Sequence, residues 1–177
     1  MNEHEWRQEF RRVWDRAVLA WHAGRKTPGS MFNAADTSFL AGAGCSTQEL
    51  FDFVDDAQCY SGDPDYETSL AVTAIRRDHF LNVLGGKSSG RTATMASLPA
   101  KSAEVDGISW LPRLIVKARL KLLGEMPAQL MYGCAGDRPF LRRMNLTLPQ
   151  FLELVRDSGD DDRRIVNAVK RAAGGSN

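Results

Sequence analysis

The strongest constraint on the fold is that one stretch of the chain recurs, with changes, about a hundred residues later. The segment DTSFLAGAGCSTQELFDFVDD begins at Asp36, and DRPFLRRMNLTLPQFLELVRD begins at Asp137. An offset of 101 residues aligns positions 16–56 with 117–157 without a gap, and it includes the identical pairs Ala17/Ala118, Leu19/Leu120, Ala34/Ala135, Asp36/Asp137, Phe39/Phe140, Leu40/Leu141, Val54/Val155 and Asp56/Asp157. The pattern predicts an internal duplication. The alternative is two unrelated amphipathic helices that share a common pattern.

Both copies show helical periodicity. Near the N-terminus, apolar residues recur at three- and four-residue steps, which places them on one helical face: Trp6, Phe10, Val13, Trp14, Ala17, Val18 and Trp21. The motifs STQE at Ser46 and TLPQ at Thr147 are typical of capping boxes that begin a helix. Further helices are expected over about 65–84 and 161–172, and none of the chain shows a competing strand pattern. The sequence therefore predicts an all-α fold.

The chain divides into two helical units joined by a segment of different composition. Residues 1–84 form the first predicted unit, and residues 109–177 form the second. Residues 85–108 are rich in Gly, Ser and Ala and predict a linker or a long surface loop. Because units of this size bury little apolar surface alone, we expect them to pack around a shared core with a crevice between them.

Composition and charge exclude several classes of protein. The chain has 177 residues and a net charge of +1, so no excess positive field favours nucleic acid or an anionic membrane. Basic doublets such as Arg76–Arg77 are accompanied by aspartates, which predicts a solvated, salt-bridged helix surface. The three cysteines are odd in number and form no CxxC pair, so we expect reduced thiols and a bacterial cytoplasmic location.

No cofactor or metal is expected. The GGKSS segment at Gly85 lacks the first glycine of a phosphate-binding loop, which would fall on Leu81. The histidines and cysteines do not have metal-ligand spacing. Cys134 has only His79 as a distant candidate base, which does not favour a catalytic thiol.

The second unit carries a recognisable signature. The segments SWLPRLIVKARLKL, YGCAGDRPFLRR and FLELVRD resemble the bacterial family of domain of unknown function 5069. The first half, with ELFDFVDD and ETSLAVTAIRRDHFL, is similar to the N-terminal part of longer members. The resemblance implies a helical fold and no known activity, with signature positions at Trp110, Pro112, Arg113, Lys117, Ala118, Arg119, Asp137, Phe140 and Leu141.

The candidate ligand-binding residues all lie in the second unit: Trp110, Arg113, Lys117, Tyr132, Asp137 and Arg138. Arg113 and Lys117 are four positions apart on a helix expected to start near Ser109, so both cations share one face and could bind a phosphate or carboxylate. The alternative is a solvated basic stripe. Asp137 is expected to cap the helix that begins at Arg138, as Asp36 would in the first copy; the alternative is a general base.

Two functional hypotheses follow. The first is a binding or adaptor module for a small anionic ligand or a partner protein. The second is a small cytoplasmic enzyme with an Arg/Lys/Asp/Tyr site in the second unit. The sequence favours binding because it supplies no paired acid and base, activated nucleophile or cofactor loop.

Overall fold

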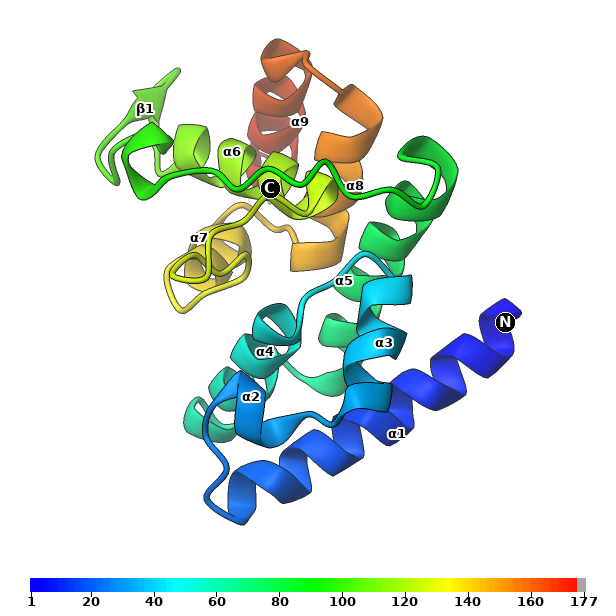
Figure 1. Cartoon of the computed structure of the whole chain (residues 1–177). Helices are drawn as coiled ribbons and strands as arrows, with labels where there is room; N and C mark the ends of the chain where they lie inside the picture. The colour runs from blue at the N-terminus through cyan, green and yellow to red at the C-terminus, as the bar shows by residue number, and fades with distance from the viewer. Residues whose placement is uncertain (175–177) are drawn as a thin grey trace.

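The computed structural model describes residues 1–174 and is predominantly helical, as predicted. The first half contains α1 (Glu3–His22), α2 (Pro28–Met31), α3 (Ala34–Gly42), α4 (Thr47–Cys59) and α5 (Tyr66–Asp78). The second half contains α6 (Leu111–Leu123), α7 (Asp137–Arg143), α8 (Leu148–Ser158) and α9 (Asp162–Gly174). Figure 1 shows α1 to α4 at the bottom of the molecule and α6 to α9 at the top, with α5 between them.

One hydrophobic core runs through both halves. Helix α1 packs on α4 and α5, α6 packs on α8, and α8 packs on α9. The contact between α5 and α8 joins the halves, so the core is continuous. Leu40, Phe140 and Leu141 are buried in it. Phe39 is only partly buried, because it lies at the edge of the core against the ring of Trp6.

The helix boundaries follow the 101-residue offset where caps define them. Helices α4 and α8 begin at Thr47 and Leu148, and each follows a complete capping box, Ser46 with Glu49 and Thr147 with Gln150. Helices α3 and α7 end at Gly42 and Arg143. The halves also differ, since α1 is 20 residues long and α6 is 13.

The segment between the halves has more structure than the predicted loop. Helix α5 continues as the π-helix η1 (His79–Val83), and a 3₁₀ turn η2 (Met95–Ser97) follows. Strands β1 (Glu104–Val105) and β2 (Ile108–Ser109) then pair antiparallel in a short hairpin. This hairpin was not predicted, because two-residue strands have too few positions to show an alternating pattern.

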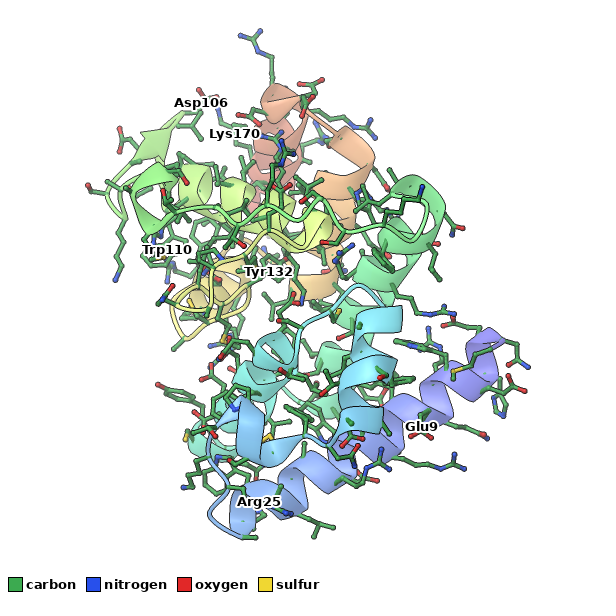
Figure 2. All side chains as sticks on the ribbon, viewed as in Figure 1. Glu9, Arg25, Asp106, Trp110, Tyr132 and Lys170 are labelled. Carbon is green, nitrogen blue, oxygen red and sulfur yellow. The ribbon has the colours of Figure 1, made fainter. Side chains whose placement is uncertain are left out.

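The hairpin and the segment before it are fastened to the second half. Lys170 of α9 forms an ion pair of 2.8 Å with Asp106 at the hairpin turn, and both are labelled at the top of Figure 2. The backbone N–H of Ala93 donates to the carbonyl of Glu125 at 2.9 Å. Residues 84–94 thus form an exposed strap that passes close to the C-terminal end of α6.

Candidate functional site

The signature residues of the second half meet around the carboxylate of Asp137. Its oxygens accept hydrogen bonds from the indole N–H of Trp110 at 3.0 Å and from the backbone N–H of Gly133 at 2.9 Å. Lys117 completes the set with an ion pair to Oδ2. Figure 2 shows Trp110 and Tyr132 in this region, beside α7.

The predicted capping role of Asp137 is wrong. Asp137 is the first residue of α7, and the preceding Gly136 makes no side-chain cap. Asp36 also lies inside its helix, where it is the N3 partner of the capping residue Asn33. In both halves the aspartate turns toward a cation of the preceding long helix, Arg16 or Lys117.

The Asp137 network is closed. Lys117 and Asp137 are 2% and 0% exposed, so a solute cannot reach the pair without displacing other side chains. The ammonium group of Lys117 also contacts the sulfur of Cys134 at 3.3 Å. The hydroxyl of Tyr132 donates to the carbonyl of Leu148, and burial, followed by the charge of Asp137, raises its pKa well above the ordinary value. These are properties of a buried structural network.

The other two predicted cations point elsewhere. Arg113 donates to the carbonyl of Pro99 at 2.7 Å, in the segment before the hairpin. Arg138 is 4% exposed and pairs with Asp56 at 2.6 Å and Asp63 at 3.0 Å, which ties the second half to the first. The structure therefore brings Trp110, Lys117 and Asp137 together, and it places Arg113 outside that group.

A different arginine is buried without a partner. Arg76 of α5 is 1% exposed, and its Nε and Nη1 atoms have no hydrogen-bond partner. Among residues 1–174 its guanidinium makes no ion pair, and its closest aromatic contact is the ring of Phe80, 5.2 Å away. Burial lowers the pKa of Arg76, against the opposing influence of Cys45 and Glu49. Arginine stays charged under such conditions, so a bare positive charge lies inside the protein.

Arg76 lines a cavity of about 340 Å³ where four parts of the chain meet. The walls come from the α3–α4 connection, the α5–η1 junction, the strap and the segment after α6: Ala41, Gly44, Cys45, Ser46, Glu49, Arg76, Phe80, Ser88, Thr92, Gly124 and Met126. The cavity therefore lies at the junction of the two halves, where we expected a crevice.

Two glycines make room for the guanidinium. Gly44 and Gly124 have φ of +68° and +70°, a backbone conformation that glycine adopts without strain. A Cβ at Gly44 would lie 2.8 Å from Nη2 of Arg76, and one at Gly124 would lie closer still. Gly124 ends α6, so the partial negative charge of that helix end lies beside Arg76.

Glu49, the other charged group of the cavity, already has partners. Glu49 accepts from the ammonium of Lys121 and from the backbone N–H of Ser46, each at 2.7 Å. Burial is the largest influence and raises the pKa of Glu49, but the charge and hydrogen bond of Lys121, the hydrogen bond from Ser46 and the charge of Arg76 together shift it downward. Burial raises the pKa of the Cys45 thiol to about 12, so this thiol is neutral.

The prediction that Arg76 and Arg77 are both solvated is wrong for Arg76. Arg77 does form a surface ion pair with Glu3 at 2.8 Å. Arg76 follows Ser69 and Thr73 by seven and three positions, which places it on the buried face of α5. This helical periodicity was the signal available in the sequence.

Two other kinds of feature are absent from the described residues. Between residues 1 and 174, no group of three or more His, Cys, Asp or Glu side chains is arranged to hold a metal ion. In the same range, no helix is long and apolar enough to cross a bilayer.

Fold and site together define a two-part helical protein with a buried arginine at the junction. Residues 97–176 match the model of the family described as "Domain of unknown function (DUF5069)". The match starts inside the segment predicted as a linker and does not include the first half, where a resemblance was also expected. No curated protein and no solved structure matched the chain. Arg76 lies outside the matched residues, whereas Gly124 and Met126 lie within them.

Proposed function

We propose that the protein is a binding module for a small anionic ligand and that the ligand binds in the Arg76 cavity. The observation that carries this proposal is a guanidinium that is 1% exposed, has no hydrogen-bond partner at Nε and Nη1, and lines a cavity. An unpaired buried charge costs several kcal/mol unless something compensates it. A bound carboxylate or phosphate would supply that compensation through the planar fork of donors.

Binding, and not catalysis, is the role that these groups support. The Cys45 thiol has a pKa of about 12 and is a poor nucleophile, and Glu49 is held by Lys121 and Ser46. The alternative of an enzyme built on Lys117, Tyr132 and Asp137 has no accessible substrate position, since these three side chains are buried.

The location and origin of the protein are part of the same proposal. We place it in the bacterial cytoplasm, which the three free cysteines support because they form no disulfide. We attribute the two halves to internal duplication, which the shared helix starts and the equivalent pairs Arg16–Asp36 and Lys117–Asp137 support. Superposing residues 16–56 on 117–157 of an experimental structure tests this origin, and different helix packing in the two segments would contradict it.

Thermal melting tests the anion site. Wild type, Arg76→Met and the neighbouring control Arg77→Met are melted in sodium acetate, sodium benzoate and sodium phosphate, against sodium chloride of equal ionic strength. A ligand specific for the folded state raises the Tm by mass action. We expect at least one oxyanion to raise the Tm of wild type and Arg77→Met but not that of Arg76→Met. The proposal is overturned if no oxyanion raises the wild-type Tm, or if Arg76→Met keeps the increase.

A further inference from the structure

Two charged side chains line the Arg76 cavity, Arg76 and Glu49, and only Glu49 has an ion-pair partner. Arg76 and Lys121 are positive, and Glu49 is negative. Arg76 is 1% exposed, and the side chains of Lys121 and Glu49 are 2% and 15% exposed, so little water reaches the three groups. Cys45 is neutral, and Lys121 and Glu49 neutralise each other across 2.7 Å. Arg76 has no counter-charge of its own, so a ligand carboxylate placed beside the guanidinium would supply one.

The cavity wall also contains a carboxylate. Glu49 lines the same cavity as Arg76 and its partner Lys121 does not, so a ligand bound to the guanidinium meets the carboxylate of the pair and not the ammonium. A phosphate monoester carries a charge between −1.5 and −2 at pH 7 and would be repelled by Glu49. A ligand with a hydrogen-bond donor next to its carboxylate would instead donate to Glu49, which has free lone pairs beyond its bonds to Lys121 and Ser46.

The size and lining of the cavity limit the rest of the ligand. Its volume of about 340 Å³ is at the lower end of the range for small-molecule pockets. Ala41, Phe80 and Met126 supply apolar wall, and Ser88 and Thr92 supply hydroxyls from the strap. A compact metabolite with an apolar side chain fits this lining better than a nucleotide.

We infer that the Arg76 cavity selects a small monocarboxylate that carries an adjacent amino or hydroxyl donor, in preference to a phosphate ester. The carboxylate pairs with Arg76, the donor faces Glu49, and the apolar part packs against Phe80 and Met126. This inference rests on the proposed anion site and specifies its ligand class.

Three probes of similar size separate the possibilities. L-phenylalanine has the carboxylate and the donor, 3-phenylpropionate lacks the donor, and phenyl phosphate replaces the carboxylate by a dianion. Because a hydrogen bond to a charged group contributes about 1.5–3 kcal/mol, calorimetry should give L-phenylalanine a Kd about tenfold or more below those of the other two.

A double variant tests the part assigned to Glu49. Glu49→Gln with Lys121→Met removes the carboxylate and its partner together, so no buried charge is left unpaired. Glutamine preserves the capping box, as Gln150 does at the equivalent position of α8. In this variant the preference for L-phenylalanine should fall to about threefold or less, since a neutral amide neither attracts the ammonium nor repels the phosphate. Circular dichroism and thermal melting establish that the variant is folded, and Asp52→Asn on the same helix is the control that keeps the preference.

The outcomes distinguish a failure of the inferred ligand class from a failure of the proposed anion site. If phenyl phosphate or 3-phenylpropionate binds wild type as tightly as L-phenylalanine, and Arg76→Met abolishes this binding, the ligand class is wrong and the anion site stands. If the double variant is folded and keeps the full preference, the role of Glu49 is wrong. If none of the three probes binds and no oxyanion raises the wild-type Tm, both the inference and the anion site fail.

Discussion

Lys117 and Arg76 are both cations removed from water, and only one of them has a partner. Lys117 is 2% exposed and pairs with Asp137, which also accepts from Trp110 and Gly133. Arg76 is 1% exposed, and its Nε and Nη1 atoms have no partner. A buried pair with all its hydrogen bonds made is part of the scaffold. A buried charge without a partner lowers stability, and such features concentrate where a protein binds something.

The first half contains a more open version of the Lys117 pair. Arg16 and Asp36 occupy the equivalent positions, but the Arg16 side chain is 43% exposed. Arg16 lines a cavity of about 270 Å³ together with Arg25 and Asn33. In the second half the indole of Trp110 donates to Asp137 and packs against Gly136, where a Cβ would lie 2.7 Å from the ring. The cation of the pair is therefore open to water in the first half, although Asp36 is buried, whereas both members are buried in the second half.

The largest predicted effect comes from removing Lys117 from its buried ion pair with Asp137. Lys117→Met leaves the carboxylate of Asp137 buried without its counter-charge, so we expect a loss of about 3–5 kcal/mol in the free energy of unfolding. The matched control is Arg16→Met, which should cost about 1 kcal/mol or less because the Arg16 side chain is 43% exposed and water can take its place beside Asp36. Urea denaturation measures both. Equal losses in the two variants would show that burial does not distinguish the halves.

The second prediction is an increase in the free energy of unfolding. Arg76→Met replaces an unpaired charge by an apolar side chain of similar length, so without ligand it should raise the free energy of unfolding by about 1–3 kcal/mol. Urea denaturation in chloride buffer gives the value, and Arg77→Met serves as the control with little change. A marked destabilisation by Arg76→Met would show that the guanidinium is satisfied in the folded protein.

The smallest predicted effect concerns Asp52, a partly buried carboxylate near Lys121. Burial raises the pKa of Asp52 to about 6, with Gln48 donating to its carboxylate at 2.7 Å. Since the native state holds this proton more tightly than the unfolded chain, its contribution is present below about pH 4 and is lost as pH rises to about 6. Asp52→Asn should therefore be more stable than wild type by about 1 kcal/mol at pH 7, with the difference disappearing below about pH 4. A stability difference between wild type and Asp52→Asn that stays constant from pH 4 to pH 7 would contradict the raised pKa of Asp52.

Local signals predicted the helices well. The capping boxes at Ser46 and Thr147 determine where α4 and α8 begin, because the side chain and the backbone group it satisfies are three residues apart. The apolar stripe from Trp6 to Ala17 predicted the buried face of α1. The hairpin at residues 104–109 was missed, because its strands pair over two residues and depend on contacts such as Asp106 with Lys170.

The candidate site was predicted in part. Trp110, Lys117 and Asp137 do meet, and their spacing on α6 and at the start of α7 was visible in the chain. Their arrangement as a closed network was not visible, because closure depends on the distance between α6 and α7 and on the indole of Trp110 filling the space.

The sequence by itself determined that this protein is helical, where most helices begin, and which faces of them are apolar. These properties depend on residues within one or two turns of each other. Only the tertiary structure decided which cation is buried and which one pairs with a carboxylate. Arg76 and Arg77 are neighbours in the chain, but successive side chains on an α-helix are rotated by about 100°. Arg76 therefore faces the end of α6 and the strap, whereas Arg77 lies beside Glu3. Desolvation and pairing depend on what packs against each face, and those partners come from positions far away in the sequence.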